Sequence, residues 1–247
     1  MARLMKISLD RGVAVYVIDS YTERGIRQAD IDSGRVSLNM SARLLDAFSA
    51  TKALSGNRKV DMSKIYVTGE SFGGLVALAS SSNIILNGVK ELGVNFAGHI
   101  PISPECLTRP QDLSYNGKPM MIIVGDKDEI TPAKHCVNLV ADMKPNSNVE
   151  LKIIKTCGHS LLQGSRSPFN FDFFAYDECG RWVFDDKGQY TLIDKGGVND
   201  GGGLADFMKV FSTCGKMANF HEAPSDKVRD EVESYIANFL DKFVVAH

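Results

Sequence analysis

A single serine stands between glycines in the segment 67–78, which reads VTGESFGGLVAL. An apolar run leads into the Gly-x-Ser-x-Gly motif, Gly69 to Gly73, and a run with helical spacing follows it. A serine at the join of a buried strand and a helix is typical of a nucleophile elbow, a tight turn that holds the hydroxyl above a sheet. Ser71 is therefore the candidate nucleophile, and the backbone N–H of Phe72 is the candidate donor to an oxyanion. The alternative is a glycine-rich turn in which the serine is incidental.

A serine hydroxyl needs a base to become a nucleophile, and the base needs an acid that orients it. In sites built on this kind of elbow, the acid and then the histidine follow the serine, on loops after later strands. His159, in KTCGHS, directly follows the strand-like run 149–155 and is the candidate base. The other histidines lie inside predicted elements or far along the chain: His99, His135, His221 and His247.

Three carboxylates follow the strand-like run 119–125, in the segment IIVGDKDEITP: Asp126, Asp128 and Glu129. A side chain on the third residue past the glycine can turn back toward the histidine loop, whereas the first residue is expected to cap the turn. Asp128 is therefore the candidate acid, and Asp126 is interpreted as a turn residue.

These side chains have to be positioned by alternating strands and helices, which predicts an α/β fold with a mostly parallel sheet flanked by helices. The predicted strands are 12–19, 64–69, 95–103, 119–125 and 149–155. The predicted helices are 37–54 after a serine cap, 72–87, 131–143 after a Thr-Pro start, and 225–244 after a serine cap. The run 12–19, GVAVYVID, has the continuous apolar character of a strand buried on both faces.

Residues 163–223 interrupt this alternation. The segment 181–193 predicts a β-hairpin that turns at Asp-Asp-Lys-Gly, and 195–203 is a glycine-rich connector. We interpret the excursion as a cap or lid-like insertion before the last helix, within a single domain over 1–247.

The composition excludes several classes of protein. Of 247 residues, 44% are hydrophobic and 23% charged, with a formal net charge of −2, which argues against disorder. No basic stripe indicates a nucleic-acid partner, and no apolar run approaches the roughly 18 residues of a membrane span. The start, MARLMKISLDRG, does not have the pattern of a signal peptide, and the compartment is left open.

The five cysteines have irregular spacings and form no Cys-x-x-Cys pair: Cys106, Cys136, Cys157, Cys179 and Cys214. We expect several buried thiols, with one or no disulfide among them. Neither this spacing nor the glycine run 195–203 indicates a metal or phosphate site, so no metal or cofactor is predicted.

The segments GESFGG, VGDKDEITP and CGHS, in this order, with VIDSYTERG after the first predicted strand, resemble the dienelactone hydrolase family of α/β-hydrolases. The resemblance covers about residues 10–160 and the last helix, and it implies the α/β-hydrolase fold. The nucleophile of that family is often a cysteine, and Ser71 in its place favours a general carboxylesterase. The family's arginine after the strand equivalent to 12–19 meets an acidic substrate group, which implies a substrate-binding role for Arg24, with Arg27 beside it.

The resemblance also implies a second oxyanion donor, on a loop after a third strand. The start of the chain looks like the helix that follows this loop, so we expect the first three strands to be absent. The third strand would lie between 12–19 and 64–69. Without it, these two segments pair directly, or its place is taken by the hairpin 181–193 or by a swapped partner chain. Tyr21 is the expected substitute donor, and Glu70 is a second candidate for contact with substrate.

The sequence therefore predicts a serine hydrolase that cleaves small-molecule carboxylic esters through an acyl-enzyme. A peptidase of the same fold and a hydrolase-like binding protein with weak catalysis are the alternatives. The expected partner is the ester substrate, with no nucleic acid and no membrane, and the sequence is compatible with a homodimer.

Overall fold

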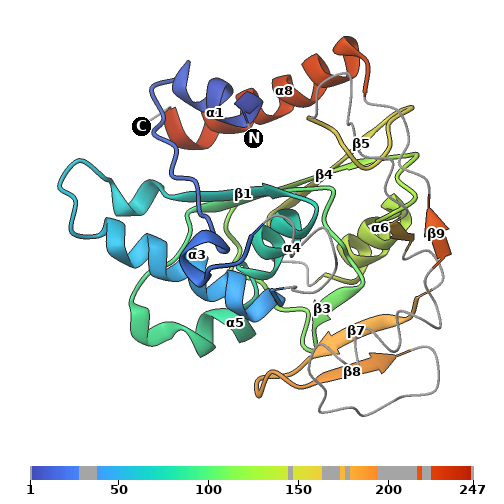
Figure 1. Ribbon diagram of the computed structural model, residues 1–247, viewed down its shortest axis with the longest axis horizontal. Helices are drawn as coiled ribbons and strands as arrows, with labels where there is room; N and C mark the ends of the chain where they lie inside the picture. The colour runs from blue at the N-terminus through green and yellow to red at the C-terminus, as the bar shows by residue number, and fades with distance from the viewer. Residues whose placement is uncertain are drawn as a thin grey trace.

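A parallel sheet forms the centre of the molecule in the computed structural model, which describes residues 2–27, 38–143, 147–162, 173–175, 179–193, 216–218 and 224–245. Its strands lie in the order β1-β2-β4-β5, and all neighbours are parallel (Figure 1). They are β1 (Tyr66–Glu70), β2 (Gly98–Ile102), β4 (Met120–Gly125) and β5 (Val149–Ile154). The predicted α/β fold with a mostly parallel sheet is confirmed, and each of these strands was expected from the sequence.

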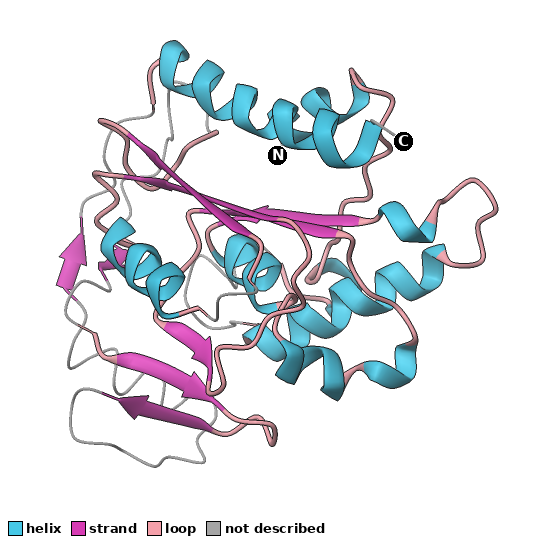
Figure 2. Ribbon diagram, turned by 180° about the vertical axis from the view of Figure 1, so that it is seen from behind, coloured by secondary structure: helices cyan, strands magenta, loops and turns pink. Residues whose placement is uncertain are grey.

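Helices cover both faces of this sheet, as Figures 1 and 2 show from opposite sides. One face carries α1 (Ala2–Leu9) and α8 (Asp226–Leu240), which lie side by side. The other face carries α3 (Met40–Leu54), α4 (Phe72–Ala79), α5 (Asn83–Gly88) and α6 (Ala133–Asp142). Short turns of helix are η1 (Thr22–Arg24), η2 (Met62–Lys64), η3 (Lys90–Leu92) and η4 (Asp241–Val245).

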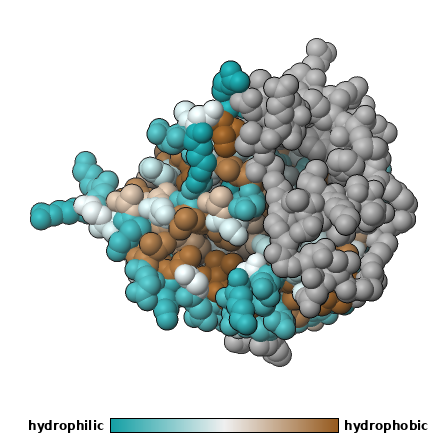
Figure 3. Space-filling model, turned by 60° about the horizontal axis from the view of Figure 1, so that its bottom comes forward, coloured by the Kyte–Doolittle hydropathy of each residue, from teal (hydrophilic) through white to brown (hydrophobic). Residues whose placement is uncertain are grey.

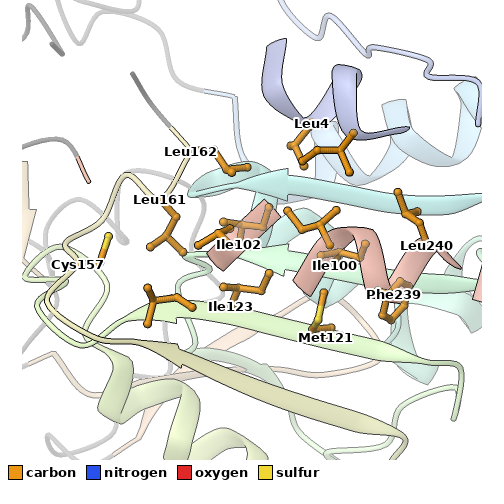
Figure 4. Close-up of a cluster of buried hydrophobic side chains, with 14 residues drawn as sticks. Leu4, Ile100, Ile102, Met121, Ile123, Cys157, Leu161, Leu162, Phe239 and Leu240 are labelled. Carbon is orange, nitrogen blue, oxygen red and sulfur yellow. The ribbon is translucent and has the colours of Figure 1, made fainter. Parts of the chain in front are cut away.

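The central strand β4 is buried on both faces, as its apolar sequence MMIIVG requires. Met121 and Ile123 pack with residues of α1 and α8, in the cluster drawn in Figure 4. Ile122 and Val124 point the other way, into a cluster with residues of α4 and α6. Because successive side chains of a strand alternate between faces, β4 joins the two helical layers into one core.

Two of the predicted helices differ most from the observed ones. The expected helix 37–54 begins at Met40, and Asn39 caps it by accepting a hydrogen bond from the Ala42 N–H at 2.9 Å. The expected helix 72–87 is interrupted between α4 and α5. The hydroxyls of Ser80 and Ser81 there bond carbonyls three residues back, at 2.9 and 2.6 Å, which competes with continuation of the helix.

The predicted strand 12–19 is wrong. This segment runs extended beside the sheet, from the layer of α1 to η1 on the other side (Figure 1), without joining any described strand. Its apolar side chains are exposed: Val15 37%, Tyr16 61%, Val17 47% and Ile18 40%. A β-branched run favours an extended backbone, but it forms a strand only when a neighbour supplies the ladder. In the described part of the chain β1 pairs with β2 alone. The predicted direct pairing of 12–19 with the strand at 64–69, which is β1, is therefore also wrong. Because the segment is exposed, water can reach the backbone N–H and C=O groups that no strand pairs with.

The predicted hairpin 181–193 is confirmed as β7 (Arg181–Phe184) and β8 (Tyr190–Ile193), which are antiparallel. It does not fill a slot beside β1, because β7 pairs in parallel with β3 (Thr108–Pro110), a strand that the sequence did not indicate. The strands β6 (Phe173–Ala175) and β9 (Lys216–Ala218) form a separate antiparallel pair. The rest of the predicted insertion, with the connector 195–203 and His221, lies outside the described residues, as does His247.

The expectation of one or no disulfide is wrong. Cys106 and Cys136 are joined, with their Cα atoms 5.0 Å apart, and Cys179 is also disulfide-bonded. Cys157 is a free buried thiol, and Cys214 lies outside the described residues. The first disulfide connects the loop after β2 to α6. These two segments are separated by 30 residues, so their spacing in the sequence did not indicate the pair.

The described surface carries a continuous apolar area. Figure 3 turns the bottom of Figure 1 toward the reader, the side of α5 and the β7–β8 hairpin, and shows apolar residues there with polar residues around them. Partly buried side chains of α5 and the following turn pack against α3 and α4, among them Ile84, Ile85 and Val89.

None of the described helices combines the length and the hydropathy needed to span a bilayer.

Candidate active site

Ser71 is the single residue between β1 and α4, and its backbone is forced into an unusual conformation. Its φ of 58° and ψ of −119° lie in a region that residues with a side chain rarely adopt. Such strain persists only where the surrounding structure imposes it, and it is the geometry of a nucleophile elbow. The turn places the Ser71 hydroxyl at the carboxyl end of the parallel sheet.

Two glycines make this turn sterically feasible. A Cβ on Gly69 would lie 2.5 Å from the carbonyl carbon of Gly73, and a Cβ on Gly74 would lie 2.4 Å from the Ile102 carbonyl oxygen. A Cβ on Gly73 itself would have no atom within 4 Å. Gly74, the residue after the five-residue motif, has no room for a side chain. Gly73, the last residue of the motif, has room for one.

The structure brings together the three residues that the sequence singled out as nucleophile, base and acid. His159 Nε2 lies 2.8 Å from Ser71 Oγ, and His159 Nδ1 lies 2.9 Å from Asp128 Oδ2. The side chains of His159 and Asp128 are 9% and 0% exposed. With the proton on Nδ1, the imidazole donates to Asp128 and presents a lone pair to the serine hydroxyl.

The Asp128 carboxylate is held by a set of donors from its own loop. Its Oδ1 accepts from the N–H groups of Ile130 and Thr131 at 3.0 and 2.8 Å. The Thr131 hydroxyl lies 2.8 Å from Oδ2 and donates to it. Thr131 was expected only as part of a helix start, yet it positions the acid. The Asp-x-x-Thr spacing is the one signal that could have indicated this local turn.

The histidine loop is fastened by backbone contacts with the ends of neighbouring strands. After β2, the Ser103 hydroxyl donates to the His159 carbonyl at 2.7 Å. After β4, the Lys127 N–H donates to the Cys157 carbonyl at 2.8 Å. A Cβ on Gly125 would lie 2.2 Å from that same carbonyl oxygen, so only glycine allows the two loops to approach.

Glu70 also fastens the histidine loop. Its Oε1 accepts from the N–H groups of Leu161 and Leu162 at 2.8 and 3.4 Å. Burial raises the pKa of the Glu70 carboxyl, and these N–H donors together with His159 act in the opposite direction. The sequence suggested Glu70 as a contact for substrate, whereas the structure directs its carboxylate to the loop that carries the base.

Replacing Glu70 by Ala is expected to lower kcat by about tenfold or more with little change in KM. The Leu161 N–H loses its acceptor, and small displacements of a catalytic group have effects of this size. Glu70→Gln keeps a carbonyl acceptor and serves as the matched control, with activity near that of the wild type. Steady-state kinetics on a 4-nitrophenyl ester distinguish the two roles. A raised KM at unchanged kcat would instead support the direct substrate contact.

The two candidate oxyanion donors are connected to Ser71 in different ways. Phe72 is the first residue of α4, so its N–H has no acceptor within the helix and is available to an oxyanion. The Tyr21 ring contacts the Arg43 guanidinium, 4.9 Å from the ring centre to its carbon, and the Phe72 ring contacts the same group at 4.2 Å. Tyr21 is thus joined to the nucleophile turn through Arg43.

The remaining predicted residues are engaged elsewhere. Arg24 donates to both carboxylate oxygens of Asp46, at 2.8 and 2.7 Å, and Arg27 also takes part in an interaction. Asp126 lies 3.8 Å from Lys155 Nζ and has no described contact with His159. Among the residues described, no three His, Cys, Asp or Glu side chains are grouped so that they could hold a metal ion.

Comparison with known proteins finds a matching family and solved structures of partial similarity. The family of alpha/beta hydrolase domains matches residues 9–174. A thermophilic esterase from the planctomycete Thermogutta terrifontis is 19% identical, with a TM-score of 0.43 over 53% of this chain and 59% of the esterase. An alpha-beta serine hydrolase homologue from Coxiella burnetii is 20% identical, with a TM-score of 0.35 over 50% of this chain and 53% of the homologue. The chain thus spans less than two thirds of either protein. No curated protein matches this sequence.

Proposed function

Because the chain belongs to the alpha/beta hydrolase domain family, we propose that it is a serine hydrolase that cleaves carboxylic esters of small molecules. The observation that carries the proposal is the continuous hydrogen-bonded arrangement of Ser71, His159 and Asp128, with Ser71 at a positive φ. We further propose that it is a serine-nucleophile member of the dienelactone hydrolase type. The order of GESFGG, VGDKDEITP and CGHS supports that assignment.

The first half of the proposed reaction forms an acyl-enzyme. Ser71 Oγ attacks the ester carbonyl carbon while His159 Nε2 takes the hydroxyl proton. The carbonyl oxygen becomes an oxyanion, to which the Phe72 N–H donates. Asp128 keeps the imidazole in the Nδ1–H tautomer and stabilises the imidazolium. His159 then gives the proton to the departing alkoxide, so the alcohol leaves and the acyl group remains on Ser71.

The second half repeats these steps with water as the nucleophile. His159 Nε2 takes a proton from water as its oxygen attacks the acyl carbon. When the second oxyanion collapses, His159 returns the proton to Ser71 Oγ and the carboxylic acid is released. In this proposal Ser71, His159 and the Phe72 N–H serve both halves of the reaction without rearrangement.

A fluorophosphonate probe tests the proposal, because it reacts only with an activated serine. The wild-type chain is expected to be labelled at Ser71, and Ser71→Ala is expected to remain unlabelled. A panel of 4-nitrophenyl esters of increasing acyl length, with the matching 4-nitroanilides, then separates an esterase from a peptidase. A wild-type chain that is folded but neither labelled nor active would contradict the proposal and favour a hydrolase-like binding protein.

A further inference from the structure

A groove lies at the amino ends of β4 and β5, under the last turns of α8, and its volume is about 260 Å³. A cavity of roughly 150 Å³ can hold benzene, so this groove has room for one substituted aromatic ring. Ser71, Asp128 and His159 follow the carboxyl ends of β1, β4 and β5, and none of the three lines the groove. The groove is therefore separate from the candidate active site, at the opposite end of the parallel strands.

Aromatic side chains form one wall of the groove. Tyr235, Phe239 and Phe243 recur at intervals of four residues along α8 and η4, so they lie on one side of this helical segment. The rings of Phe239 and Phe243 have their centres 4.8 Å apart. Phe239 packs in one cluster with Met121 of β4, which also lines the groove (Figure 4). Rings and a thioether are favourable neighbours for another aromatic ring.

The strand β5 contributes charged side chains to this apolar wall. On the sheet face that α8 covers, β4 presents Met121 and Ile123, and their partners in register on β5 are Glu150 and Lys152. Lys152 Nζ lies 4.7 Å from the centre of the Tyr235 ring and 2.5 Å from Glu150 Oε1. The side chain of Lys152 is 26% exposed and that of Glu150 is 62% exposed. Glu150 can therefore turn into solvent and leave the ammonium group to a ligand at low cost.

A second ammonium group lines the same groove. Lys242 Nζ lies 4.8 Å from the centre of the Phe243 ring, and among the described residues no carboxylate pairs with it. The side chains of Asn148 and Asn238 add amide N–H donors. The lining thus carries two positive charges and, on Glu150, one negative charge. This net charge complements a ligand with a single negative charge.

We propose that this groove binds a small aromatic anion, with its ring among Tyr235, Phe239 and Met121 and its charge between Lys152 and Lys242. The site goes beyond the proposed function, because its occupant contacts none of the groups assigned to ester cleavage. Ring and charge are both required, since the aromatic wall and the two ammonium groups lie in one groove.

Three matched compounds test the site in titrations of the ¹⁵N-labelled full chain by NMR: 4-ethylbenzoate, the uncharged 4-ethylbenzamide, and hexanoate, which keeps the charge without a ring. We expect 4-ethylbenzoate to bind with a Kd of about 1 mM or lower and to shift the backbone amide signals of 148–152 and 235–243. The other two compounds are expected to bind at least about fivefold more weakly.

Lys242→Gln removes one of the two charges from an exposed position, so the fold is expected to be unchanged. It is expected to weaken 4-ethylbenzoate binding by about three- to tenfold and 4-ethylbenzamide binding by less than about twofold. Lys227→Gln removes an exposed positive charge from the start of α8, outside the groove, and is the matched control with unchanged binding.

Binding to Ser71→Ala is expected to equal binding to the wild type, so failure of the catalytic proposal leaves this one standing. No binding of 4-ethylbenzoate at concentrations up to about 10 mM would overturn the site. Equal affinity for the benzamide or for hexanoate, or signal changes confined to the candidate active site, would overturn it as well. The lysines would then serve only to complement the end of a helix and to protect the edge of a sheet.

Discussion

Ser71→Ala is expected to lower kcat for ester hydrolysis by about 10⁴-fold or more, and His159→Ala by a similar amount. The serine hydroxyl lies 2.8 Å from Nε2, so each variant removes one half of the same proton transfer. Residues that act as a unit have losses that do not add. The double variant is therefore expected to be no slower than the slower single variant. Hydrolysis of a 4-nitrophenyl ester at substrate concentrations above KM provides the measurement.

The fold has to be intact in these variants for the result to be meaningful. Ser71 is only partly buried, and removal of its hydroxyl leaves the backbone contacts of the turn in place. Far-ultraviolet circular dichroism and the melting temperature are expected to match the wild type for Ser71→Ala. Losses that multiply in the double variant would show that the two residues act independently, and substantial activity in Ser71→Ala would contradict the mechanism itself.

Asp128→Asn is expected to lower kcat by about 10⁴-fold through the tautomer of His159, as in other triads of this kind. The Asn carbonyl can still accept from the Ile130 and Thr131 N–H groups, so the loop keeps its conformation. The Asn amide N–H₂ then faces His159 Nδ1, which becomes the acceptor, and the proton moves to Nε2. A protonated Nε2 cannot take the proton of Ser71.

Asp126→Asn is the matched control for this experiment, because it makes the same chemical change two residues earlier. The Asp126 carboxylate lies 3.8 Å from Lys155 Nζ and has no described contact with His159, so we expect a change in kcat of less than about tenfold. If Asp126→Asn has the larger effect, the assignment of the acid is wrong.

The sequence was sufficient for features that depend on neighbouring residues. The glycines around Ser71, the strand before it and the helix after it lie within a dozen residues, and their steric requirements are local. The same holds for Asp128 and His159, each of which lies in the loop just after a predicted strand. Because the carboxyl ends of parallel strands meet at one edge of a sheet, the strand pattern was enough to place the three loops together.

Features that depend on contacts between distant segments could not be predicted from the local sequence. The run 12–19 has the composition of a buried strand, and only the absence of a described neighbour keeps it from being one. The contact of Glu70 with the histidine loop was not predicted, because its partner, the Leu161 N–H, lies 91 positions away. Arg24 and Arg43 are equally basic in the sequence, and which of them pairs with Asp46 is decided by the packing of η1 against α3. The disulfide between Cys106 and Cys136 likewise follows from the tertiary structure.

The close approach of backbones at Gly69, Gly74 and Gly125 has a consequence for how such a protein can change over generations. Each of these glycines lets main chain touch main chain, so the geometry between the three loops does not depend on which larger side chains surround them. An inherited substitution at any of these three glycines would push two backbones apart, and the loops of the candidate nucleophile, base and acid would move with them. A substitution on the outer face of a surrounding helix leaves the same contacts in place. Descendants of this chain can therefore vary on their surface, whereas these three positions are held to the smallest residue.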